Sequence, residues 1–243
     1  MKKAFILHAN EKPILIISSG RRFNYLKDTI EGLAKHTLNL DKVFKKVWIL
    51  DDRSSIGERV LIGELMTKYF GDKYQSIYFN SNEPFAFVDK FNMVKKLSDK
   101  NDTIFFLEDD WVLNRPFNFQ HHTNILRKSD WTSISLTDPL WLQDESYSKY
   151  IVKEEYWKNP FPKPYKHPLE WMENRSKCRW VSVAMNHYTN NPNLSKGEIY
   201  HKTEFKNIKN FEAEFAQDTQ GNHVFHQTCY FNHIGKDSLI DQL

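Results

Sequence analysis

The chain has 243 residues and a formal net charge of +3, and 27% of its residues are charged. This length suits one large α/β domain with a full core, so we expect a single domain over residues 1 to 243. The small positive charge falls well short of the clustered lysine and arginine of a dedicated nucleic-acid binder, and it suits an anionic small ligand equally well.

Neither a leader nor a membrane span is expected. His8, Asn10 and other polar residues interrupt the apolar stretch within residues 1 to 17, which argues against a signal peptide. No apolar run approaches the roughly 18 to 20 residues of a membrane-spanning helix. We therefore expect a soluble, cytoplasmic protein. Cys178 and Cys229 are expected to be reduced thiols, because they lie far apart without metal-ligand spacing and two thiols in a chain of this size do not make a disulfide framework.

Strand-like and helix-like segments alternate through the first half. Residues 13 to 19 form a β-branched run closed by Gly20, and residues 23 to 36 carry apolar side chains at helical spacing. The same criteria predict further strands at 45 to 51, 75 to 79 and from 103, and helices at 58 to 70 and about 85 to 97. Such alternation predicts an α/β fold whose largely parallel sheet is covered by helices.

The fourth of these strands carries the most informative motif. An apolar run that begins at Thr103 stops at three adjacent acids, Glu108, Asp109 and Asp110. Adjacent carboxylates repel one another unless a cation is present, and Mg²⁺ or Mn²⁺ takes one or two carboxylates together with water and phosphate oxygens. The motif indicates a divalent metal site, with a solvated turn that caps the strand as the alternative.

Three polar clusters follow predicted strands, at residues 18 to 22, 51 to 55 and 108 to 110. The carboxyl ends of parallel strands share one edge of a sheet, and ligands of α/β proteins bind beyond that edge. We therefore expect the three clusters to converge on one crevice.

The strand ends resemble those of a known family. Ile-Leu-Ile-Ile-Ser-Ser-Gly-Arg, Val-Trp-Ile-Leu-Asp-Asp-Arg-Ser-Ser and Phe-Phe-Leu-Glu-Asp-Asp-Trp occur in that order, and they resemble the nucleotide-sugar-binding half of GT-A glycosyltransferases, particularly the family 2-like enzymes. Glu-Asp-Asp is one form of that family's DxD motif. The resemblance implies a GT-A fold with a nucleotide-sugar-binding half at 13 to 115 and an acceptor-binding and C-terminal half at 116 to 243.

The resemblance also implies an activity. The protein would be a metal-dependent glycosyltransferase that moves a sugar from a nucleoside-diphosphate sugar, with UDP-sugars favoured, to a hydroxyl of a glycan, protein or other acceptor. Its cofactor would be Mn²⁺ or Mg²⁺.

Donor-binding roles follow for the first two clusters. Asp51 or Asp52 would hydrogen-bond the base or ribose, with a plain strand-ending turn as the alternative. Ser18, Ser19 and Arg21 would lie beside the nucleotide and its pyrophosphate, whereas Arg22 is expected to be solvated surface. Lys90 either helps to shape the nucleotide pocket or lies on a helix surface.

The acidic cluster and one late histidine would serve the metal. Asp110 would be the direct ligand, while Glu108 and Asp109 contact the ribose or a metal-bound water. The family often supplies a late histidine as a further ligand, and His233 fits that position, with His223 and His226 as weaker candidates.

The second half would supply the acceptor site and the base. Strands are predicted at 131 to 137 and 179 to 185, and the aromatic-rich residues 138 to 177 either stack on sugars or pack a lid. An inverting transferase needs a carboxylate base, for which the candidates are Glu212, Glu214 and Asp218. Residues 190 to 196 resemble a segment that follows an acceptor-side strand in the family, and Lys236 or Ser238 would contact the diphosphate.

Other readings remain. Dinucleotide-binding, Walker and nucleophile-elbow motifs are absent from the sequence, and it lacks the glycine-rich signature of nucleotide-sugar pyrophosphorylases. The alternatives are a non-catalytic carbohydrate- or nucleotide-binding protein of the same fold, and a phage glycosyltransferase whose acceptor is a modified DNA base.

Overall fold

The computed structural model describes residues 11 to 79, 87 to 129, 131 to 136, 192 to 202, 222 to 225 and 230 to 235, and at 87, 88 and 222 to 225 it describes the backbone only. Its strands are β1 (Ile14–Ser19), β2 (Lys46–Asp52), β3 (Tyr74–Phe79), β4 (Thr103–Glu108), β5 (Trp111–Leu113), β6 (Trp131–Ser135), β7 (Asn193–Lys196), β8 (Asn222–Phe225) and β9 (Phe231–His233). Its helices are α1 (Phe23–His36), α2 (Leu40–Val43), α3 (Ile56–Phe70), the 3₁₀ turn Gly71–Lys73, α4 (Phe87–Leu97), α5 (Phe119–Lys128) and α8 (Gly197–Lys202).

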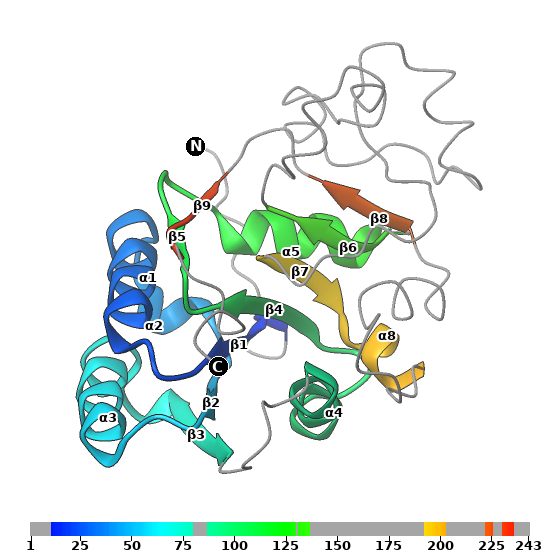
Figure 1. The fold of residues 1–243 in the computed structure, drawn as a ribbon. Coiled ribbons are helices and arrows are strands. Elements are labelled where there is room, and N and C mark those ends of the chain that lie inside the picture. Colours follow the sequence, from blue (N-terminus) through cyan, green and yellow to red (C-terminus); the bar gives the residue numbers. More distant parts are fainter. Residues whose placement is uncertain are drawn as a thin grey trace.

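Seven of the strands form one twisted sheet in the order β3-β2-β1-β4-β7-β6-β8 (Figure 1). The first four strands in this order pair in parallel. Strand β7 runs antiparallel to both β4 and β6, and β8 runs parallel to β6. The prediction of an α/β fold with a largely parallel sheet is confirmed. Strands β5 and β9 form a separate two-stranded sheet.

Helices cover both faces of the large sheet, and the alternation of side chains along β1 shows why. Leu15 and Ile17 join a core with α1, α3 and α5, whereas Ile14 and Ile16 join a core with α4 and α8. All four side chains are at most 1% exposed. A strand buried on both faces reads as a continuous apolar run, which is what residues 14 to 17 show.

Helix α3 begins directly after the second polar cluster. Ser55 caps it by accepting a hydrogen bond from the Glu58 backbone N–H at 3.2 Å, and the Glu58 carboxylate accepts one from the Ser55 backbone N–H at 2.9 Å. This capping box satisfies two of the unpaired donors of the first turn. It therefore fixes the direction in which the chain leaves β2.

The structure contains elements that were not predicted, among them α5, α8, β8 and β9. Helix α2 and strand β5 were not expected, because segments of four and three residues carry no detectable periodicity. Strand β7 lies within residues 190 to 196, which the resemblance placed after a strand. The predicted strand at 179 to 185 and the aromatic-rich residues 138 to 177 lie outside the described residues.

In the described part of the chain, no helix is both long enough and apolar enough to cross a bilayer.

Candidate active site

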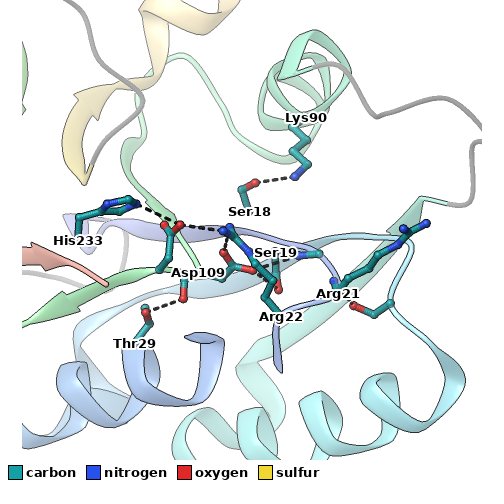
Figure 2. Close-up of polar contacts among 11 residues, drawn as sticks. Ser18, Ser19, Arg21, Arg22, Thr29, Lys90, Asp109 and His233 are labelled. Carbon is teal, nitrogen blue, oxygen red and sulfur yellow. Dashed lines mark hydrogen bonds and ion pairs between the residues drawn. The ribbon is translucent and has the colours of Figure 1, made fainter. Parts of the chain in front are cut away.

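Polar residues that end β1, β2 and β4 lie side by side at the carboxyl edge of the sheet. The strand register pairs Ser19 with Asp51 and Ser18 with Glu108. Figure 2 shows Ser19, Arg22 and Asp109 turned toward one another and Lys90 of α4 pointing toward Ser18 of β1, whereas Arg21 points away from them. The prediction that the three clusters converge is confirmed.

Asp109 is the buried centre of this edge. Its side chain is fully buried, and Oδ2 accepts hydrogen bonds from Ser19 Oγ and from the Gly20 backbone N–H, both at 3.1 Å. Its backbone is fixed as well, since Thr29 Oγ1 donates to the Asp109 carbonyl at 2.8 Å. Burial raises the pKa of Asp109 to about 6, because the nearby Arg22 charge only partly offsets the loss of solvent. Asp109 thus ties the β1–α1 turn to the end of β4.

Arg22 lies just before α1 and turns toward the acids instead of the solvent. Its Nη2 donates to Asp109 Oδ1 and its Nη1 to Asp110 Oδ2 at 2.9 Å, and the side chain is only 13% exposed. Burial alone would lower the pKa of Arg22, but the charges of Asp109 and Asp110 outweigh it and raise that pKa. The expectation that Arg22 is solvated surface is wrong.

Asp110 and His233 are brought together by the small β5–β9 sheet. Trp111 of β5 pairs with His233 of β9, and the Ile234 backbone N–H donates to the Asp110 carbonyl at 2.8 Å. As a result, His233 Nε2 lies 3.3 Å from Asp110 Oδ2 (Figure 2). The imidazole packs on the Trp111 ring at 4.8 Å between centroids and stays half exposed.

The Asp110–His233 pair fits a divalent metal. Asp110 Oδ1 is buried and has no hydrogen-bond partner among the described residues, which is costly for a carboxylate oxygen unless something binds it. Two ligands at right angles around Mg²⁺, each at about 2.1 Å, lie roughly 3 Å apart, close to the observed 3.3 Å. The described residues contain no group of three or more metal-ligating side chains. Such a site therefore suits a cation that keeps water or phosphate as further ligands.

Asp51 and Asp52 at the end of β2 are held by neighbouring side chains. Asp51 is fully buried, accepts from Ser54 Oγ at 2.5 Å and has Arg59 Nε 3.5 Å from Oδ2. Burial raises the pKa of Asp51, while Ser54 and Arg59 act in the opposite direction. Asp52 is 4% exposed and accepts from Arg53 Nε at 3.1 Å. Both acids are therefore fixed in place at the edge where a nucleotide is expected.

Lys90 of α4 is buried at this edge. Of the two positions considered for it, the exposed helix surface is therefore wrong. Lys90 Nζ donates to Ser18 Oγ at 2.7 Å, and the residue is 6% exposed. Burial lowers the pKa of Lys90, while the charges of Asp109, Asp52 and two further acids of the edge act against that shift. A buried ammonium group is stable only when nearby carboxylates offset its charge.

The turn after β1 is the exposed side of the edge. A Cβ on Gly20 would lie 2.7 Å from the Asp52 carbonyl oxygen, so only glycine lets β1 and β2 end this close together. Arg21 follows with a positive φ of 53° and an exposed side chain, and its backbone N–H donates to Ser54 Oγ at 3.1 Å. An open pocket of about 500 Å³ borders Arg21 and Arg22.

Several candidates from the second half lie outside the described residues. These are Glu212, Glu214, Asp218, His226, Lys236 and Ser238, and the two cysteines, Cys178 and Cys229. The side chain of His223 in β8 is also not described. Their roles stay predictions.

No protein-family model and no curated protein matches this sequence. Solved structures, in contrast, do match the fold of this chain. The chain is similar to the mannosyltransferase PcManGT from Pyrobaculum calidifontis in complex with GDP-Man and Mn²⁺, with a TM-score of 0.57 and 10% identity over 98% of this chain. It is also similar to GalNAc-T7 with UDP, GalNAc and Mn²⁺ (TM-score 0.59, 12% identity, 92% of this chain) and to TarS of S. aureus (0.56, 12%, 92%).

These likenesses concern the fold. The chain spans 62%, 44% and 37% of the lengths of PcManGT, GalNAc-T7 and TarS, respectively. At such low identity they show that the chain has the GT-A architecture of these glycosyltransferases, as the resemblance of its strand ends implied.

Proposed function

We propose that this protein is a metal-dependent glycosyltransferase that uses a nucleoside-diphosphate sugar, with a UDP-sugar favoured, and transfers the sugar to a hydroxyl of a glycan or protein. One observation carries the proposal most directly. A carboxylate with an unpartnered buried oxygen, Asp110, lies 3.3 Å from the imidazole of His233 at the carboxyl edge of a GT-A sheet. Two of the similar structures hold Mn²⁺ with a nucleotide or nucleotide sugar, which supports the same chemistry here.

In this proposal Asp110 and His233 hold the divalent cation. Once bound, the cation would offset the negative charge that develops on the departing nucleoside diphosphate. Asp109 does not reach the ligand, because its carboxylate is fully buried and engaged by Ser19, Gly20 and Arg22. It acts instead as a positioning residue that holds the turn carrying Asp110.

The other strand ends bind the nucleotide. Arg21 lies at the exposed side of the edge and would pair with a phosphate. Asp52, which is 4% exposed, would accept from the ribose or base. Glu108 is the partly exposed member of the acidic cluster and would contact the ribose. The charge of Lys90 acts against the burial that raises the pKa values of Asp51 and Asp109.

The base and the acceptor site are proposed from the second half of the chain. Glu212, Glu214 and Asp218 are the candidates for the group that accepts the proton of the attacking hydroxyl. Glycans, proteins and modified DNA are the acceptor classes to compare in an assay.

The test is a donor screen followed by one substitution. The protein is incubated with Mn²⁺ and with UDP-, GDP- and CMP-sugars, and release of the nucleotide is measured. Asp110→Asn keeps the shape of the side chain but removes its charge, so turnover should fall about a hundredfold or more, because a bound metal contributes several kcal/mol to such a transition state.

The matched control is Asp28→Asn on the exposed surface of α1, which should keep wild-type turnover. Unchanged turnover in folded Asp110→Asn would refute the assignment. Stabilisation by a nucleotide without any release from a donor sugar would favour the binding-only alternative.

A further inference from the structure

Arg22 is hydrogen-bonded to the same carboxylate oxygen of Asp110 that contacts His233. Asp110 Oδ2 accepts from Arg22 Nη1 at 2.9 Å and lies 3.3 Å from His233 Nε2. A divalent cation shared by Asp110 and His233 would therefore lie within a few ångströms of a guanidinium charge, which repels it strongly in a partly buried site. A metal bound between Asp110 Oδ2 and His233 and the guanidinium bonded to Oδ2 therefore exclude each other.

The guanidinium is suited to hold the site in the absence of a metal. Its planar fork spans two carboxylates, with Nη2 on Asp109 and Nη1 on Asp110, a geometry that lysine cannot reproduce. Within the described residues, five acids of the edge (Asp51, Asp52, Glu108, Asp109 and Asp110) face four cations (Arg22, Arg53, Arg59 and Lys90), which leaves a single excess negative charge. The chain thus supplies most of its own counter-charge.

The Arg22 side chain also has space beside it into which it can move away from Asp110. It borders the open pocket of about 500 Å³ that also contains Tyr25, and its guanidinium carbon lies 5.6 Å from the centre of the Tyr25 ring. Its Nε is buried and has no hydrogen-bond partner among the described residues, so the side chain is held only through its two terminal nitrogens. An incoming diphosphate offers the anionic oxygens that a guanidinium prefers.

We propose that Arg22 is an exchangeable internal cation: it competes with the divalent metal for Asp110, and a diphosphate draws it away, so that metal and donor bind together. This inference rests on the proposed function for the identity of the metal and the donor. It adds that Arg22 weakens metal binding in the empty site and strengthens the coupling between metal and nucleotide.

The experiment measures Mn²⁺ affinity without nucleotide, from the electron paramagnetic resonance signal of free Mn²⁺. Arg22→Gln should bind Mn²⁺ about tenfold or more tightly than the wild type, because a unit charge a few ångströms from the cation is removed. Arg22→Lys, which keeps the charge but loses the fork, should be intermediate. Arg115→Gln removes an exposed arginine elsewhere and should match the wild type.

A second titration, with UDP present, tests the exchange. UDP should tighten Mn²⁺ binding by a larger factor in the wild type than in Arg22→Gln. An equal factor, or Mn²⁺ affinity in Arg22→Gln that is no higher than in the wild type, overturns the inference. If Arg22→Gln does not fold, wild-type Mn²⁺ affinity in Arg22→Lys overturns it instead.

The outcomes separate this inference from the proposed function. Tighter Mn²⁺ binding by Arg22→Gln, in a protein that turns over no donor sugar, supports the competition and contradicts the transferase activity. Donor turnover with Mn²⁺ affinity that is insensitive to Arg22 does the reverse.

Discussion

Replacing Gly235 by alanine should displace the two proposed metal ligands without removing either of them. A Cβ at this position would lie 2.4 Å from Asp110 Oδ2 and 3.1 Å from His233 Nε2, whereas ordinary contact begins at 3.4 Å. The carboxylate must therefore retreat by about 1 Å, the difference between 3.4 and 2.4 Å. That shift breaks the 2.9 Å hydrogen bond from Arg22 to Asp110. It also displaces Asp110 Oδ2 from its position beside His233 Nε2.

The magnitude follows from what is lost. A hydrogen bond to a charged group contributes about 1.5 to 3 kcal/mol, so Gly235→Ala should lower the free energy of unfolding by about that amount in metal-free buffer. Mn²⁺ affinity should fall about 10- to 100-fold, the range seen when metal ligands lose their orientation. Urea denaturation and Mn²⁺ titration measure the two effects separately.

Gly57→Ala is the matched control, since a Cβ there meets nothing within 4 Å. It lies in the first turn of α3, where alanine should leave stability unchanged or raise it by up to about 1 kcal/mol. If Gly235→Ala matches Gly57→Ala in both stability and Mn²⁺ affinity, the geometry inferred for Asp110 and His233 is wrong.

Three further predictions concern residues around the site and the core. Lys90→Met should destabilise the protein by about 3 kcal/mol in urea denaturation, because it removes a buried positive charge that offsets the charge of the acids at the edge. A loss no larger than that of the same substitution at an exposed lysine would contradict this role. Burial lowers the pKa of His122 to about 3 from 6.5, so the stability from this neutral histidine is present above pH 6.5 and lost as the pH falls toward 3. Between pH 7 and pH 5 the free energy of unfolding should fall by about 2 kcal/mol because of His122. In His122→Phe, urea denaturation at the two pH values should show a fall that is smaller by this amount. Ser55→Ala should cost about 1 kcal/mol by removing the cap of α3, a change that thermal unfolding would detect.

The order of strands and helices in the first half could be predicted because each segment carries its own period. Residues 14 to 17 are apolar without a break because both faces of β1 are covered, and residues 23 to 36 show the helical spacing of α1. Convergence of the polar strand ends followed from the parallel arrangement alone. Local pattern was sufficient for all of these features.

Arg22 and Lys90 could not be placed in the same way. Arg22 pairs with acids 87 and 88 residues away, and Lys90 with a serine 72 residues away. An arginine in a turn and a lysine on a helix are solvated in most proteins, so nothing local distinguished these two. The short strands β5 and β9 also depend entirely on their distant partner. The family resemblance named His233 of β9 as a metal ligand, and that role stays a prediction.

Strand β7, which runs antiparallel to both of its neighbours in the large sheet, has a consequence for how the chain assembles as it is synthesised. Strands β1 to β4 pair among themselves and can form once residue 108 has emerged, but β7 must insert between β4 and β6 from residue 193 onward. Long-range insertion of this kind is slow, because the loop must close before its contacts stabilise it. His233 follows later still, on β9. The acidic edge is therefore built early and held by Arg22, while the pair that would bind a metal is completed only after residue 233 has emerged.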